Sequence, residues 1–520
     1  MAPATRARWR GSLTLALALA VAGGCGARTD PGLVDAGWCA SDVDCSDGLY
    51  CTGIERCIES RCVADIPVDC DDGDPCTDDL CLEPGETGPG RCHSTDLRVD
   101  ADADGYDVLR PDLDPACGDD CDDTDPLIHP GAAEVCNARD DDCDLLIDEG
   151  ASFEPSRDEI RLTFDDAASS RGSVAWSTVS ETWGVTFWDY RSSSADIYFL
   201  QLEENGEPIG DPTLLTVDPG DAFGAGIRWT GREYGIIWQD RRDGDYEIYF
   251  NQLSPEGDKL APDYRVTYAD GWSINPSMEW TGEEWAIAWQ DGRHEVETPE
   301  NYEIYLTFLD VNGWEVGDDI RLTDDPSNSE DPSLAVGEDE LGIAFVDGRE
   351  GPMQVFFLVT DLRGRTVMDP LRLSDGRADA ITPAVEWIDD GFVVMWRQDS
   401  RAGDPDILGA RIPRAPPGPV EGPVRIIDES SWSRAPSMLT DHGEVLLMFS
   451  DNRAGSYDQY YARFDSRLMR LSDDVRVTRG PRDSVFGYPA RGPTSIGVLF
   501  NDQRDGNWEV YFTQLLCVEP

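Results

Sequence analysis

Apolar and polar residues alternate through the C-terminal two-thirds of the chain, in short segments separated by turn residues. One example runs "PSMEW" at 276–280, "EWAIAWQD" at 284–291, "YEIYLTFLD" at 302–310 and "DIRLT" at 319–323. Alternation with a period of two predicts β-strands, and the Gly, Asn and Asp residues between the segments predict turns. The pattern therefore predicts units of four strands: an inner strand, two apolar strands and an outer strand.

This four-strand unit recurs along the chain, and an Asp-x-Arg group marks each copy at the end of the second strand. The groups are about 51–56 residues apart, which is the size of one blade of a β-propeller. The seven groups are Asp189/Arg191, Asp240/Arg242, Asp291/Arg293, Asp347/Arg349, Asp399/Arg401, Asp451/Arg453 and Asp502/Arg504.

The outer strands form a second series with seven members, from "EIRLT" at 159–163 to "VRVTR" at 475–479. The series begins with an outer strand, whereas the chain ends with a third strand at 508–515. We therefore predict a mainly β protein with a seven-bladed β-propeller over 156–520. In it the 159–163 strand completes the last blade and removes the open sheet edges.

The Asp-x-Arg groups, ringed by aromatic residues, suit either catalysis or a structural clamp. Seven symmetric copies favour the clamp, because a guanidinium can fork onto a carboxylate and onto turn carbonyls. The repeat resembles the propellers of TolB-like and sialidase-like secreted proteins. The Asp box of sialidases is absent from the sequence. The resemblance therefore supplies no catalytic residue, and we predict none.

The first 25 residues are typical of an export signal, with Arg6, Arg8 and Arg10 before a short apolar run. The run ends in "AGGC", which resembles the lipobox of bacterial lipoproteins. The resemblance implies a lipidated Cys25. Because Gly26 and not Asp follows it, it also implies an outer-membrane lipoprotein at the cell surface or periplasmic face. Ordinary secretion with cleavage near Ala22 is the alternative. Residues 26–38 read as a tether.

The chain has 15 cysteines, and the even number left after Cys25 predicts disulfides in an exported protein. Residues 39–95 form a Cys-rich module with too few large apolar residues to bury a core. Zinc is the less favoured alternative, because paired C-x2-C motifs are absent. We predict that Cys517 is bridged to the N-terminal modules, with Cys39 as the first choice of partner and Cys117 as the second.

Residues 96–152 form an acidic module. Its segment "DCDDTDPLIHPGAAEVCNARDDDCD" resembles the MopE-type metal-binding repeat. Alternating Asp residues followed by Gly105 also match the front half of an EF-hand-like loop, and hard cations such as calcium prefer such oxygen ligands. Two positions depart from these patterns, Pro111 and Leu145. The predicted calcium ligands are Asp100, Asp102, Asp104, Asp120, Asp122, Asp123, Asp125, Asp140, Asp142, Asp144, Asp148 and Glu149. A solvated acidic run is the alternative.

The formal net charge of −62 argues against nucleic acid as a partner and against anionic membranes beyond the lipid anchor. We predict a monomeric, lipid-anchored envelope protein in which a calcium-stabilised stalk presents the propeller to protein or polysaccharide partners. Trp272, Trp432 and Tyr488 are candidate contacts, unless they pack between blades. The alternatives are a polysaccharide-acting glycosidase or lyase of the sialidase-like type, and a TolB-like component of an envelope complex.

Overall fold

The structure is a computed structural model of the chain, divided into two compact units at Pro126/Leu127. The second and larger unit contains all the propeller strands. Among the described residues, no helix is long and apolar enough to cross a membrane. The structure describes residues 38–63, 66–85, 89–108, 117–135, 139–144, 152–192, 194–217, 220–293, 301–399, 405–414, 420–427, 431–441 and 443–518.

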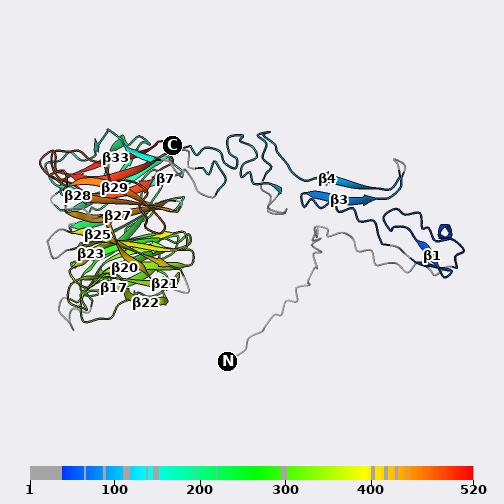
Figure 1. Cartoon of the computed structure of the whole chain (residues 1–520). Coiled ribbons are helices and arrows are strands. Elements are labelled where there is room, and N and C mark those ends of the chain that lie inside the picture. Colours follow the sequence, from blue (N-terminus) through cyan, green and yellow to red (C-terminus); the bar gives the residue numbers. More distant parts are fainter. Residues whose placement is uncertain are drawn as a thin grey trace, which may run out of the picture. The chain divides into compact units, whose positions relative to one another are not determined.

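The described part of the first unit has little regular structure, which fits a segment held by cross-links. It contains one short 3-10 helix and two antiparallel hairpins, β1–β2 and β3–β4; the second hairpin is labelled in Figure 1. The elements are η1 (Asp42–Asp44), β1 (Arg56–Ile58), β2 (Arg61–Val63), β3 (Thr77–Leu82) and β4 (Arg91–Asp96).

The disulfides correct the predicted pairing. Cys39 pairs with Cys57 and Cys117 pairs with Cys76, so neither is the partner of Cys517, which is itself disulfide-bonded. The predicted partners were wrong because Cys39 is bonded within the Cys-rich module and Cys117 joins that module to the acidic one. The other described bridges are Cys45–Cys62, Cys51–Cys81 and Cys70–Cys92.

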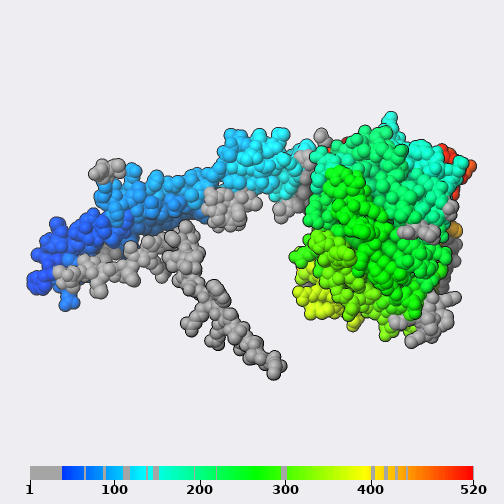
Figure 2. Space-filling model, turned by 180° about the vertical axis from the view of Figure 1, so that it is seen from behind, coloured from blue at the N-terminus to red at the C-terminus, as the bar shows by residue number. Residues whose placement is uncertain are grey.

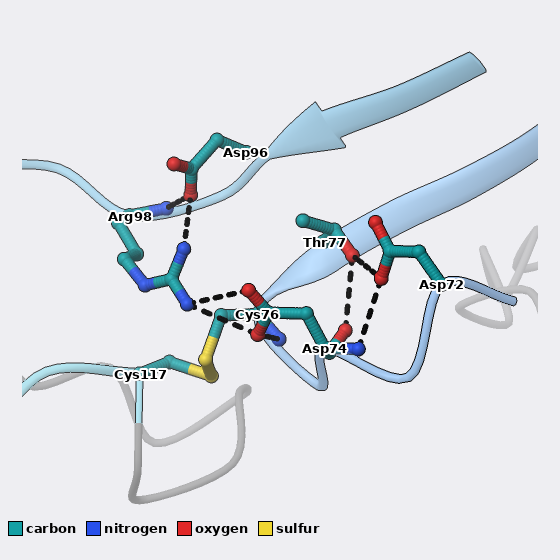
Figure 3. Close-up of a disulfide and its surroundings, with 7 residues drawn as sticks. All are labelled: Asp72, Asp74, Cys76, Thr77, Asp96, Arg98 and Cys117. Carbon is teal, nitrogen blue, oxygen red and sulfur yellow. Dashed lines mark hydrogen bonds and ion pairs between the residues drawn. A yellow bond between two sulfur atoms is a disulfide. The ribbon is translucent and has the colours of Figure 1, made fainter.

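An ion pair lies beside the Cys76–Cys117 bridge and fixes the base of the β3–β4 hairpin (Figure 3). Arg98 donates to both carboxylate oxygens of Asp74, at 3.0 and 2.7 Å, and to Asp96 at 3.2 Å. These bonds and the nearby guanidinium lower the pKa of Asp74. The bridge and the ion pair together hold the chain where it leaves the hairpin for the acidic segment.

The larger unit is a seven-bladed β-propeller, as predicted. Each blade is an antiparallel sheet in sequence order, so consecutive blades follow one another in the colour order of Figures 1 and 2. The first six blades are: β7 (Ser169–Ser177), β8 (Thr182–Asp189), β9 (Asp196–Leu202), β10 (Pro208–Leu214); β11 (Ala222–Trp229), β12 (Tyr234–Asp240), β13 (Glu247–Leu253), β14 (Tyr264–Arg265); β15 (Ser273–Trp280), β16 (Trp285–Asp291), β17 (Glu303–Leu309), β18 (Ile320–Arg321); β19 (Ser329–Val336), β20 (Glu340–Asp347), β21 (Gln354–Asp361), β22 (Thr366–Arg372); β23 (Ala380–Ile388), β24 (Gly391–Gln398), β25 (Asp406–Pro413), β26 (Glu421–Ile427); and β27 (Ser433–Asp441), β28 (Glu444–Asp451), β29 (Asp458–Asp465), β30 (Val475–Arg476).

The seventh blade closes the ring with strands from both ends of the propeller sequence. It combines β31 (Ser484–Arg491), β32 (Ser495–Asp502) and β33 (Glu509–Val518) with β5 (Ser152–Pro155) and β6 (Ile160–Arg161). In the register, Phe512 faces Ile160 and Leu515 faces Pro155. The predicted closure by residues 159–163 is confirmed.

The second and third strands of each blade are almost wholly buried, because the apolar side chains on both of their faces pack against neighbouring blades. Trp183, Trp238 and Trp285, in the second strands of the first, second and third blades, are inaccessible to solvent. Where a tryptophan meets the next blade, only glycine leaves room: a Cβ on Gly235 would lie 2.3 Å from the ring of Trp285. The seven blades therefore share one continuous core around the ring.

The Asp-x-Arg groups are buried clamps in six blades. In the second blade Asp240, 2% exposed, accepts the backbone N–H of Arg242 at 2.8 Å and its guanidinium at 2.5 Å. Arg242 also stacks over Tyr249 and donates to Asp263 at 3.0 Å. The same carboxylate–guanidinium–aromatic arrangement recurs with Asp189/Arg191/Tyr198, Asp291/Arg293/Tyr305, Asp347/Arg349/Phe356, Asp451/Arg453/Tyr460 and Asp502/Arg504/Tyr511.

The fifth blade corrects our assignment of Asp399/Arg401. Its register pairs Ala380 with Gln398, as the second blade pairs Ala222 with Asp240, so Gln398 holds the clamp position. Trp396 donates to Gln398 at 3.2 Å, just as Trp238 donates to Asp240. Asp399 lies one residue further on, and Arg401 lies outside the described residues. The Asp-Ser-Arg sequence at 399–401 is therefore one residue out of register with the clamps of the other blades.

A second repeated contact, which we did not predict, ties the outer strand of a blade to its third strand. In the third blade Arg321 and Thr323 both donate to the buried Glu303, at 2.7 and 2.5 Å. Three other blades have the same arrangement, built on Glu247, Asp458 and Glu509. The Arg-x-Thr sequence of the outer strands corresponds to this contact. We used that sequence only to predict the strands.

We predict that replacing Arg242 by Ala lowers the free energy of unfolding by about 2–4 kcal/mol, because a buried carboxylate loses its counter-charge. Chemical denaturation followed by tryptophan fluorescence measures this. Arg365→Ala is the control, since Arg365 is 77% exposed where it pairs with Asp361, and its loss should change stability by less than about 0.5 kcal/mol. Equal losses in the two variants would contradict the clamp.

Candidate functional site

The acidic loop at 100–105 folds as its alternating Asp residues predict. Asp100, Asp102 and Asp104 each accept a backbone N–H two or three residues ahead, from Ala103 at 2.6 Å, Asp104 at 3.2 Å and Tyr106 at 2.8 Å. Gly105 has a φ of 102°, a backbone conformation that residues with a side chain rarely adopt. The loop thereby gathers carboxylate oxygens of all three aspartates within 4.8 Å of one another.

The start of the MopE-like segment completes the same cluster. Ala101 donates its N–H to Asp123 at 2.7 Å, and Val108 forms a β-bridge with Asp120. Carboxylate oxygens of Asp102, Asp120 and Asp123 lie within 4.8 Å of one another. The loop at 100–105 and the start of the MopE-like segment therefore form one site.

Three oxygens of this site are buried and lack a hydrogen-bond donor: Oδ2 of Asp102, of Asp104 and of Asp120. Asp120 is completely inaccessible to solvent. Burial, together with the neighbouring carboxylates, raises the pKa of Asp102 and of Asp120. Buried carboxylates need a counter-charge, so the cluster is built around a place for a cation.

The donor set fits a hard cation. Calcium takes about six to eight oxygen ligands and tolerates irregular geometry, whereas copper prefers imidazole and thiolate. The cysteines of this stretch that the structure describes, Cys117, Cys121 and Cys143, are disulfide-bonded and offer no thiolate. When bound, calcium would neutralise the clustered charge of Asp100, Asp102, Asp104, Asp120 and Asp123.

The other predicted ligands that the structure describes have contacts of their own. Asp122 accepts the hydroxyl of Thr124 at 2.6 Å, within the same loop as Asp125. Asp140, Asp142 and Asp144 form a second acidic turn, in which burial and the neighbouring Asp144 raise the pKa of Asp142. Asp148 and Glu149 lie outside the described residues.

Two buried acids that we did not single out hold the second turn together. Glu134 accepts the N–H groups of Asp141 and Asp142 at 2.8 and 3.0 Å, and Asp141 accepts that of Val135 at 3.0 Å. Both side chains are at most 6% exposed. The sequence signal for this contact is Glu134 in the Pro-Gly-Ala-Ala-Glu segment. Its carboxylate stabilises the turn through these hydrogen bonds and also adds negative charge.

The inner strands show a second feature, repeated in all seven blades. The third residue of each has a left-handed backbone with φ between 37° and 69°, and the pairing register slips there. A left-handed non-glycine residue costs about 1 kcal/mol or more. The ring consists of Arg171, Gly224, Asn275, Asp331, Thr382, Ala435 and Phe486.

Hydrogen bonds between blades hold this strained ring. The N–H of Asn275 donates to Gln239 of the preceding blade at 2.8 Å, and that of Asp331 donates to Gln290 at 3.0 Å. At the closing seam, Arg171 donates its N–H to Asn501 at 3.0 Å. The backbone conformation thus repeats, while the side chains at this position differ from blade to blade.

These inner strands line a cavity of about 320 Å³ in the centre of the propeller. Arg171, Asn275 and Asp331 of the strained ring contribute charge and hydrogen-bonding groups, and Tyr488 contributes an aromatic ring. Arg228 lines it further along the inner strand. These residues lack sevenfold equivalents, so the ring symmetry does not explain them.

Arg228 is shared between two acidic residues at one level of the inner strands. It donates to Glu279 of the next blade at 2.7 Å, and Glu386 of the fifth blade lies close enough to interact with both charges. The pKa of Glu386 is raised to about 8, mainly by burial and also by repulsion from Glu279. The positive charge of Arg228 lowers this pKa and offsets part of the rise.

The three aromatic candidates occupy different surroundings. Trp272 and Trp432 are 46% and 47% exposed, and Trp272 packs edge-on against Tyr246. Tyr488 lies in β31 and lines the central cavity, where burial raises its pKa. Tyr488 therefore lies within an inner strand and not in a loop between blades.

Comparison with known families gives one match, to the family Cu-binding MopE, described as "Putative metal-binding motif", over residues 120–149. The match covers part of the acidic cluster, while Asp100, Asp102 and Asp104 lie outside it. The family name refers to copper, and the oxygen ligands described above suit calcium better. No curated protein matches the chain.

Solved structures similar to the chain include a subtype N10 neuraminidase-like protein of A/little yellow-shouldered bat/Guatemala, with 10% identity, a TM-score of 0.41, and 61% of this chain and 96% of that one covered. An endo-arabinase from Bacteroides thetaiotaomicron has 12% identity and a TM-score of 0.34, with 64% and 100% covered. The Penicillium chrysogenum alpha-L-arabinanase has 10% identity and a TM-score of 0.39, with 70% and 97% covered. Similarities this weak carry no argument about activity.

We predict that the full chain, stripped of metal, takes up calcium in isothermal titration calorimetry, and that Asp120→Asn lowers the affinity at least about tenfold, because changes even beyond the ligand shell cost about that much. Calcium should also protect the acidic segment from proteolysis. Asp119→Asn is the matched control, because Asp119 is exposed and outside the cluster. Absence of calcium uptake at millimolar concentration would contradict the site.

Glu386→Gln should stabilise the protein relative to wild type increasingly as the pH rises. The folded pKa of Glu386, about 8, lies above its ordinary value of 4.5. The stability that protonation supplies is therefore complete below about pH 4.5 and is lost as the pH rises through 8. Melting temperatures at pH 5 and pH 9 test this, with Glu283→Gln, an exposed residue, as control. A variant-to-wild-type difference that does not change with pH would contradict it.

Proposed function

We propose that the protein is a calcium-stabilised envelope protein that is anchored by lipid at Cys25 and uses its propeller to bind a partner. The observation that carries the proposal is the cluster of buried carboxylate oxygens at Asp102, Asp104 and Asp120, which lack hydrogen-bond donors. Calcium would order the segment between the Cys-rich hairpins and the propeller. Protein and polysaccharide are the partner classes, and the outer membrane is the proposed location.

Two further observations support export and a role in binding. The described disulfides suit an oxidising compartment outside the cytosol. The repeated Asp-x-Arg groups are buried in the blades and engaged with their own neighbours, so they support a scaffold role and not catalysis. We therefore assign binding to residues that are not repeated in every blade, such as those that line the central cavity.

A glycosidase is the second candidate, and one observation favours it. Glu279 and Glu386 are two carboxyl groups in different charge environments, as an acid–base pair requires. Arg228 already holds Glu279 in an ion pair at 2.7 Å, which suits a structural role equally. Reducing-sugar release from polysaccharides by wild type, compared with Glu279→Gln, would separate enzyme from binding protein.

We predict that Cys25→Ser moves the protein from the membrane fraction to the soluble exported fraction of a Gram-negative host, because the acyl chains supply the membrane affinity. Gly26→Asp is the matched variant: it keeps the lipid and should shift the protein from the outer to the inner membrane. Immunoblots of separated membranes measure both outcomes. Equal membrane retention of the Cys25→Ser variant would contradict the anchor.

A further inference from the structure

The central cavity contains an arginine whose charge the described residues do not neutralise by direct contact. Arg171 is fixed by its backbone N–H, which donates to Asn501 at 3.0 Å, and its guanidinium stacks over Phe486 at 4.8 Å. Among the residues that the structure describes, no hydrogen bond or ion pair reaches this guanidinium. The clamp arginines, by contrast, each bind a carboxylate. Arg171 is held in place with its donors available, which suits recognition of a carboxylate.

An acid of the same ring lies within electrostatic reach of Arg171. Asp331 accepts Nδ2 of Asn275 at 2.9 Å, and the charge of Arg171 opposes the rise in the pKa of Asp331 that burial causes. No ion pair joins the two side chains, although both line the cavity. The cavity thus presents a positive and a negative group that are separated by space.

Beyond the charged groups the walls of the cavity are mostly small or apolar. Tyr488, Pro276 and Pro383 contribute apolar surface to the lining, whereas the side chains of Ile227 and Met278, which also border the cavity, are buried. The volume of about 320 Å³ is at the lower end of the range for small-molecule sites, about 300–1,000 Å³. The cavity therefore fits a small ligand with a polar end and an apolar end.

The charge of the whole chain narrows the class of ligand. A net charge of −62 repels anions at long range, so a purely anionic ligand for Arg171 is disfavoured. A simple cation would leave Arg171 without a partner. A zwitterion satisfies Arg171 and Asp331 together and carries no net charge.

We propose that the central cavity binds a small zwitterion of the α-amino acid type, with its carboxylate on Arg171, its ammonium group on Asp331 and an apolar side chain against Tyr488 and Pro276. This inference rests on the proposed role of the propeller as the binding module. It does not depend on the calcium site, which lies in the N-terminal segment.

The test uses three matched probes on the full chain: L-leucine, L-leucinamide, which lacks the carboxylate, and N-acetyl-L-leucine, which lacks the ammonium group. We expect leucine to bind in isothermal titration calorimetry, and each modified probe to bind at least about tenfold more weakly, the cost of one charge-assisted contact. Arg171→Gln should remove the preference for leucine over leucinamide. Asp331→Asn should remove the preference over N-acetyl-leucine, and Asn tolerates the left-handed backbone at this position.

Arg232→Gln is the control variant, because Arg232 is 71% exposed and outside the cavity. Calcium uptake and the melting temperature, measured on the same samples, show whether each variant is folded. Equal binding of the three probes, or tight binding of glucuronate in place of leucine, would overturn the proposal. So would the absence of leucine binding at millimolar concentration in protein that still takes up calcium. Leucine binding without calcium uptake would overturn the metal site alone.

Discussion

The propeller depends on the pairing of its two chain ends. The last strand, β33, pairs with residues 152–155 and 160–161, which precede the first blade. Thr163 and Arg161, which precede the first blade, both donate to the buried Glu509 of β33. The seam therefore has the same contact of an arginine and a threonine with a buried acid as the second, third and sixth blades. Without this pairing, the first and seventh blades would each expose an apolar face, and the central cavity would open between Arg171 and Phe486.

The repeated acids show how a chain with so large an excess of negative charge builds a packed ring. Each clamp carboxylate is buried, and each is compensated at once by a guanidinium, a backbone N–H and usually a serine hydroxyl, as Asp291 shows with Arg293 and Ser273. The fifth blade lacks the acid, and it also has Leu408 in place of the stacking aromatic. Acid and aromatic are lost together, which is expected if they act as one structural unit.

Much of the fold could be predicted from the sequence because its determinants repeat. Strand alternation and the outer strands recur seven times and the Asp-x-Arg clamp recurs six times, and these repeats together predicted the number of blades and the closure of the ring. The disulfide partners of Cys39 and Cys117 could not be predicted, since pairing depends on how hairpins fold onto one another and not on spacing. Of the acidic cluster, the ligand types were predictable, but the contact between the 100–105 and 120–123 loops was not.

The cavity residues escaped prediction for the opposite reason: they do not repeat. Once the register is known, the third residue of each inner strand is the same backbone position, strained in the same direction in every blade. The fold requires the same backbone conformation at this position in every blade, but it does not require a particular side chain there. The fold therefore does not require Arg171 or Asp331. A non-glycine residue with this left-handed backbone has a cost in stability. In a propeller whose symmetric positions are satisfied by their own neighbours, these exceptions are the residues whose chemistry the scaffold does not explain.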